Sequence, residues 1–122
     1  MINNFIIGSR GESLACDFLI SRGFLILERN WRHKKQEVDL IATDGQYLRI
    51  VEVKSRSLTG RIEPFEAVNK NKQNLLIKAA NAYVSQKKID MEVRFDIVSI
   101  IFSPDNQQID YLPDAFYPVL RY

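Results

Sequence analysis

The sequence predicts an α/β fold with a central mixed sheet of about five strands flanked by helices. The apolar patterns run in the order helix, three strands, helix, two strands, so helical and extended segments are interspersed. An Asp-Gly pair at 44–45 joins two runs rich in Val, Ile and Leu, which indicates a β-hairpin. The 122 residues suffice for one domain with its own core, spanning 1–122.

Composition excludes several classes of protein. Hydrophobic residues make up 46% and charged residues 26%, and no apolar run is long enough to span a membrane. The first residues lack the pattern of a signal peptide, and Cys16 is the single cysteine, which excludes an internal disulfide. We therefore expect a cytoplasmic protein with no membrane partner. Its formal net charge of +2 permits a polyanionic partner without requiring one.

The first element is a helix over about residues 4–22, because apolar residues such as Ala15 and Leu19 recur at helical spacing. Gly23 follows as a cap. Glu12 falls about 20° from Leu19 on a helical wheel, so it borders the buried face. An ordinary surface acid near the helix N-terminus is the alternative for Glu12.

Residues 24–32 are predicted to form the first strand, with Trp31 in the core. The basic run 32–35 then forms a turn into the hairpin. It is either a solvated loop or a contact for phosphates. His33 is interpreted as a loop residue rather than a ligand or a general base.

A two-residue turn at 44–45 would place Asp39 opposite Ile50 and Glu37 opposite Glu52. Asp39 and Glu52 would then be diagonal neighbours, with Cα atoms about 7–8 Å apart.

On this register Asp39, Glu52 and Lys54 share one face of the hairpin. A buried carboxylate costs several kcal/mol unless it is paired or holds a metal, so these charges require an explanation. Glu37 either reaches a metal through water, or a bulge turns it outward to pair with the basic run.

A loop over residues 57–64 carries Arg61, and a second helix is predicted from Pro64 to about Lys87. Lys72 lies in the apolar stripe of that helix. It is either a lysine that snorkels to water or a cation directed at the same polyanion as the hairpin.

Residues 92–102 alternate as a strand, 103–106 form a turn and 107–112 a short edge strand. Asp96 is expected to be a buried acid paired with Arg94 or a helix lysine. Residues 113–122 are predicted to form a short helical turn and tail that cover an edge of the sheet.

Two carboxylates followed by a lysine suit metal-dependent phosphodiester hydrolysis. Asp39 and Glu52 supply the hard oxygen ligands that Mg²⁺ or Mn²⁺ prefers, with Glu12 as a further contributor. Lys54 could orient the attacking water and stabilise developing charge. The alternative is a structural salt-bridge network in which Lys54 pairs with Asp39 or Glu52.

The chain resembles the YraN-like family of small bacterial proteins, which is related to the PD-(D/E)XK nuclease superfamily and similar to archaeal Holliday-junction resolvases. The resemblance rests on the segments 8–15, 30–32, 37–41, 51–56 and 94–98 together with Lys72. It implies a restriction-endonuclease-like sheet flanked by helices. It implies that Asp39 and Glu52 bind the metal and that Lys54 acts on the attacking water. It also implies that Glu12 joins the site from the first helix. Val38 stands where the superfamily's name has proline.

The expected function is a Mg²⁺-dependent DNA endonuclease that acts on branched or other non-B DNA, for which a homodimer would present two sites. The alternative is a nucleic-acid-binding repair-accessory module that keeps the fold and cleaves poorly. RNA stays open as a substrate. The side chains expected to contact nucleic acid are the basic residues Arg10, Arg32, Lys34, Lys35, Arg56, Arg61 and Lys72.

Overall fold

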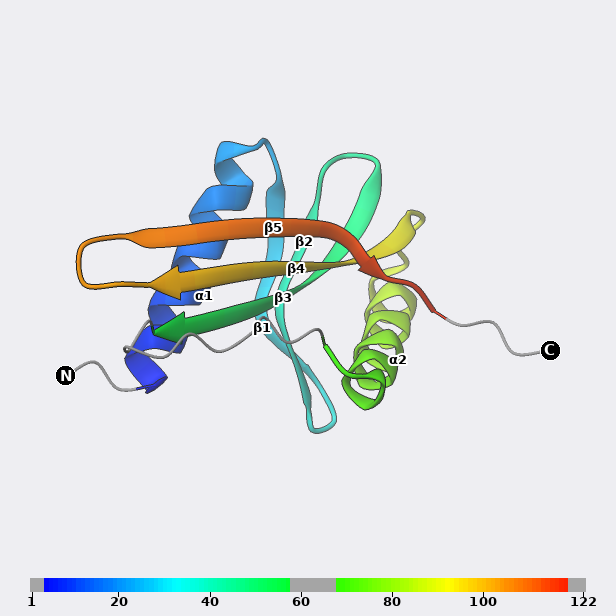
Figure 1. The fold of residues 1–122 in the computed structure, drawn as a ribbon. Helices are drawn as coiled ribbons and strands as arrows, with labels where there is room; N and C mark the ends of the chain where they lie inside the picture. Colours follow the sequence, from blue (N-terminus) through cyan, green and yellow to red (C-terminus); the bar gives the residue numbers. More distant parts are fainter. Residues whose placement is uncertain (1–3, 58–67, 119–122) are drawn as a thin grey trace.

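A five-stranded mixed sheet lies between two helices (Figure 1). The structure, a computed structural model, describes residues 4–57 and 68–118, with side chains from residue 8 onward. In chain order the elements are α1 (Asn4–Ser21), β1 (Leu25–His33), β2 (Gln36–Thr43), β3 (Tyr47–Ser57), α2 (Lys70–Lys87), β4 (Glu92–Phe102) and β5 (Gln107–Phe116). This order and the α/β fold class confirm the prediction.

The strands lie in the sheet in the order β1-β2-β3-β4-β5. β3 and β4 are parallel and pair along their whole lengths, whereas the pairs β1–β2, β2–β3 and β4–β5 are antiparallel. Parallel neighbours need a crossover connection, and α2 belongs to that connection. β3 is therefore a central strand held on both edges.

The core has two clusters, one on each face of the sheet. β3 supplies Ile50 to the cluster under α2 and Val51 to the cluster under α1, as the period of two requires. Trp31 packs against the α2 cluster, which confirms its predicted core position. Neither α1 nor α2, the helices of the described residues, has the length and apolar character needed to cross a membrane.

The helix α1 approaches β3 closely at Gly11, which is buried. A Cβ atom at this position would overlap Ser55 Oγ and lie 2.9 Å from Ser55 Cβ. The absence of a side chain therefore sets the distance between helix and strand, and with it the height of Glu12 above the sheet.

We expect Gly11→Ala to destabilise the fold by about 1–3 kcal/mol, because the added methyl group overpacks the contact with Ser55. The measurement is the free energy of unfolding in urea. Gly8→Ala is the control, since nothing lies within 4 Å of a Cβ at Gly8. A Gly11→Ala protein as stable as Gly8→Ala would contradict the close approach.

The register of the β2–β3 hairpin differs from the prediction. Thr43 pairs with Leu48, so four residues, 44–47, lie between the last paired residues of the two strands. Asp44 Oδ1 accepts the backbone N–H of Tyr47 at 2.8 Å and closes this wider turn. The predicted two-residue turn is wrong, and the pairing is offset by two residues. Because strand side chains alternate with a period of two, the predicted faces are unchanged.

The helix α2 begins at Lys70, with Asn69 as its N-cap. The Asn69 backbone is extended and its side chain accepts the N–H of Lys72 at 2.9 Å. The predicted start at Pro64 is too early, because Val68 and Asn69 are described and are not helical. Pro64 itself and the rest of the predicted loop after residue 57 lie outside the described residues.

The predicted helical turn from residue 113 is wrong, because β5 continues to Phe116. Pro113 interrupts the pattern without ending the strand, since an edge strand tolerates a residue that lacks an N–H. The pairing with β4 is irregular here: Asp114 has φ 53°, and beyond it the ring of Phe116 stacks on Phe95 at 5.0 Å. Residues 119–122 of the predicted tail lie outside the described residues.

Asp96 is fully buried, as predicted, but its partner is Arg49 rather than Arg94 or a helix lysine. Arg49 Nη1 lies 3.1 Å from Asp96 Oδ1, and the Tyr111 hydroxyl donates to Asp96 Oδ2 at 2.6 Å. The Asp114 N–H donates to Oδ1 at 2.9 Å. This network ties the irregular part of β5 to β4.

We expect Arg49→Ala to destabilise the protein by about 3–5 kcal/mol, because Asp96 would stay buried without its cation. Arg32→Ala is the matched control. Arg32 is exposed and lies 3.7 Å from Glu37, so its loss should change stability little. The measurement is urea unfolding of both variants, and equal losses would contradict the assignment of Arg49 as the partner.

Candidate functional site

The candidate site forms where β2 and β3 separate. Their backbone pairing ends at Leu40 and Val51, and Asp39 and Glu52 are the next residue on each strand. Asp39 Oδ2 accepts the backbone N–H of Val53 at 2.8 Å. The carboxylate therefore takes the place of a strand carbonyl, which explains how an acid is accommodated in the middle of the sheet.

Glu52 is the most constrained acid of the site. Its side chain is nearly buried, and Oε1 lies 3.6 Å from Nζ of Lys72 on α2. Lys72 is thus a cation directed at the hairpin, and it is Lys72 rather than Lys54 that makes the ion pair. Glu52 Oε2 is buried and has no hydrogen-bond partner among the described residues.

Lys54 follows two residues after Glu52 and therefore lies on the same face of β3. Both residues line a cavity of about 370 Å³ together with Asp39 and Glu12. The remaining lining residues are Gly8, Val53, Ser55, Arg56 and Ser57. The cavity brings together all four residues that the sequence assigned to catalysis.

Glu12 reaches this cavity from α1, and Asn30 connects it to β2. The amide of Asn30, oriented to suit its neighbours, donates to Glu12 Oε2 at 2.9 Å and to Glu37 Oε1 at 3.1 Å. Glu37 also lies 3.7 Å from Arg32, so it pairs with the basic run. The position of Glu37 opposite Glu52 is wrong, because the β2–β3 pairing ends before it.

Burial raises the pKa values of the acids of the site, and repulsion between neighbouring carboxylates adds to it. Burial, followed by repulsion from Asp39, raises the pKa of Glu52 to about 7. Burial likewise raises the pKa of Asp39 against the hydrogen bond from Val53, and burial and Asp39 raise that of Glu12. Bringing these carboxylates together is unfavourable until a cation offsets their charge.

The donor set fits a hard divalent cation. Mg²⁺ is usually held by one or two carboxylates and completes its shell with water and substrate phosphate. Asp39 and Glu52 supply those carboxylates, and the unpartnered Glu52 Oε2 is a ligand atom that nothing in the described part of the chain satisfies. Within that part, no group of three or more His, Cys, Asp or Glu side chains is arranged to hold a metal by itself.

Comparison with known sequences places the chain in a family. The model of the uncharacterised protein family UPF0102 matches residues 11–100, which include Glu12, Asp39, Glu52, Lys54 and Lys72. This chain is a member of UPF0102. A UPF0102 protein of Dictyoglomus turgidum is 45% identical over 94% of this chain and its own full length. Another from Bacteroides thetaiotaomicron is 43% identical over 93% of this chain and 94% of its own.

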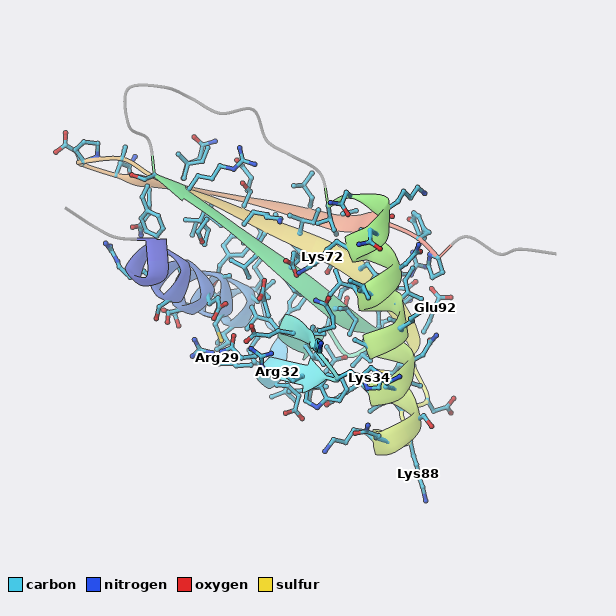
Figure 2. The ribbon with its side chains drawn as sticks, turned by 90° about the horizontal axis from the view of Figure 1, so that it is seen from below. Arg29, Arg32, Lys34, Lys72, Lys88 and Glu92 are labelled. Carbon is cyan, nitrogen blue, oxygen red and sulfur yellow. The ribbon has the colours of Figure 1, made fainter. Side chains whose placement is uncertain are left out.

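The basic residues expected to contact nucleic acid are divided among several places in this UPF0102 protein. Arg56 lines the site cavity and Lys72 pairs with Glu52. Arg10 lies over the ring of Phe102 at 5.0 Å. Figure 2 shows Lys72 near the strands, and Arg32 and Lys34 beside the β1–β2 turn. Lys35 also belongs to that turn, and Arg61 lies outside the described residues.

Sequence reasoning missed three contributors to the site. Asn30 bridges Glu12 and Glu37, Gly11 fixes the distance of α1, and the buried Ser55 Oγ has no hydrogen-bond partner among the described residues. A glycine within a helix was the available signal for Gly11, because it implies a close approach. The contacts of Asn30 depend on its left-handed backbone, which no local pattern shows.

We expect the metal-free protein to lose stability as the pH rises from about 4.5 to about 7. The folded state, with the pKa of Glu52 raised to about 7, binds more protons in this window than the unfolded chain does. The loss should be on the order of 1–3 kcal/mol in urea unfolding with EDTA.

Glu52→Gln should reduce the slope of this pH profile, because it removes the acid whose pKa is raised to about 7. Glu92→Gln is the matched control, since Glu92 is exposed on β4 (Figure 2) and its loss should keep the wild-type slope. A profile that stays steep in Glu52→Gln would show that another group causes it.

Proposed function

We propose that this protein is a divalent-metal-dependent nuclease of the PD-(D/E)XK type that hydrolyses phosphodiester bonds in DNA, with branched DNA as the favoured substrate. The observation that carries the proposal is the nearly buried Glu52, which lines one cavity with Asp39 and Lys54 and whose Oε2 has no hydrogen-bond partner among residues 4–57 and 68–118. Leaving an acid unsatisfied is costly, and occupation by a hard cation would reverse that cost.

In this proposal Asp39 and Glu52 hold Mg²⁺ or Mn²⁺, which when bound supplies a more acidic water and offsets charge on the phosphate. Lys54 lines the same cavity and orients the attacking water, while its ammonium group stabilises developing negative charge. Glu12 accepts a hydrogen bond from Asn30 and stays directed into the cavity from α1. Arg56 and Lys72 lie where they can neutralise phosphates next to the reacting one.

A second candidate is a nucleic-acid-binding accessory module that does not cleave. The Lys72–Glu52 contact of 3.6 Å favours it, because a lysine can neutralise the buried acid in place of a metal. The two candidates differ in whether Mn²⁺ stabilises the protein. A nuclease site gains thermal stability from Mn²⁺ and loses that gain in Glu52→Gln, whereas the module gains none.

We expect wild-type protein with Mg²⁺ or Mn²⁺ to cut at least one labelled substrate among four-way junction, flap, single-stranded and duplex DNA. Glu52→Ala and Lys54→Ala should each lower the rate on the order of 10²-fold or more, because each removes a group that acts in the transition state. EDTA should abolish cutting. The measurement is product formation on denaturing gels.

Lys88→Gln is the matched control, since it removes a lysine at the far end of α2 (Figure 2) and should leave the rate unchanged. Cutting that persists in both Glu52→Ala and Lys54→Ala would identify a contaminating nuclease. Binding of DNA without cutting in any metal would favour the accessory module.

A further inference from the structure

A second groove lies between the β1–β2 turn and α2, apart from the acidic cavity. It has a volume of about 410 Å³, the size of a small-molecule site. The described residues that line it are His33, Lys34, Lys35, Gln36, Leu75 and Lys78. In Figure 2, Lys34 lies beside α2.

The charge of the groove selects a polyanion. Lys34, Lys35 and Lys78 surround it, and none of the described residues that line it is acidic. The two turn lysines are held by the turn itself, in which Lys34 has φ 56° and His33 pairs with Gln36. The turn fixes where these lysines leave the backbone, and ammonium groups gathered around a groove are suited to phosphate oxygens.

The groove also offers apolar contacts that phosphates would not use. Leu75 is 39% exposed there. The ring of His33 is parallel to that of Trp31, with an interplanar angle of 6° and centroids 6.3 Å apart. Trp31 is in turn held edge-on by Tyr83 at 5.1 Å. His33 is therefore a supported aromatic ring beside an exposed leucine, a combination that suits the face of a nucleobase.

Two elements connect the groove to the acidic cavity over the same distance. Along α2, Lys78 is six residues from Lys72, which pairs with Glu52; six residues span about 9 Å. Along β2, Gln36 is three residues from Asp39, which is about 10 Å. Both lengths are close to the length of three nucleotides, at the spacing of roughly 3.4 Å per nucleotide along one strand of a DNA helix.

We propose that this groove binds an unpaired nucleotide of the DNA substrate, about three nucleotides from the cleaved phosphodiester. The base packs on His33 and Leu75, and the adjoining phosphates bind Lys34, Lys35 and Lys78. A fully paired duplex keeps its bases stacked inside and offers no apolar face to the groove, whereas a flap, gap or frayed arm does. The inference rests on the proposed nuclease function and narrows it to DNA with a single-stranded segment.

Binding to fluorescein-labelled DNA in EDTA, followed by anisotropy, tests the apolar contacts without cleavage. His33→Ala and Leu75→Gln should each weaken binding of single-stranded and flap DNA by about 5- to 100-fold, and blunt duplex by less than about twofold. His33→Phe keeps an aromatic ring and should retain wild-type affinity. Thermal melts of each variant exclude loss of folding as the cause.

The lysines are tested by salt dependence on single-stranded DNA. Lys34→Gln and Lys78→Gln should each lower the slope of log affinity against log salt by about 0.7, because one phosphate contact is lost. Lys88→Gln carries the same charge change outside the groove and should keep the wild-type slope.

Equal effects of His33→Ala on duplex and flap, or no effect on either, would overturn the inference. Binding of a poly-glutamate peptide that depends on Leu75, with no such dependence for DNA, would overturn it in favour of a protein partner. The two proposals can fail separately. If the groove assignment fails, the wild-type protein can still cleave DNA in a way that requires Glu52, and the proposed nuclease stands. If the wild-type protein shows no cleavage that depends on Glu52, the proposed nuclease function is rejected.

Discussion

The separation of β2 from β3 is the constraint on which the candidate site depends. Up to Leu40 and Val51 the two strands pair through their backbones. Beyond that point the Asp39 carboxylate accepts the hydrogen bond from the N–H of Val53. The replacement is possible because β3 is held on its other edge by β4 along its whole length. Because β3 stays paired with β4 where β2 separates from it, Glu52 and Lys54 can line a cavity while the sheet stays intact.

Periodicity made the element order and the faces of the hairpin predictable, because an offset of two residues leaves every side chain on its face. The offset itself was not predictable, since it depends on Asp44 closing a wider turn with its side chain. Long-range pairing was beyond sequence reasoning as well. Arg49 and Asp96 lie far apart in the chain, and only the parallel pairing of β3 with β4 brings them together.

Two buried acids on neighbouring strands show opposite ways of accommodating charge. Asp96 receives an arginine, a tyrosine hydroxyl and a backbone N–H, so both of its carboxylate oxygens have hydrogen-bond partners. Glu52 has one lysine at 3.6 Å, and its Oε2 has no hydrogen-bond partner in the part of the chain that the structure describes. A hydrogen-bond network in which every group has a partner stabilises one structure, whereas an acid with an unpartnered oxygen can still bind a ligand such as a cation. This difference, more than burial, separates a structural acid from a candidate ligand.

The irregular end of β5 has a consequence for how copies of this chain can associate. An exposed strand edge is a template onto which another chain can add by backbone hydrogen bonds. Pro113 removes one donor from this edge, and the left-handed backbone of Asp114 turns the neighbouring peptide out of line. The last part of β5 therefore resists continuation of the sheet into a second molecule, which protects this edge against strand-mediated aggregation and leaves the edge formed by β1 as the other place where a strand could add.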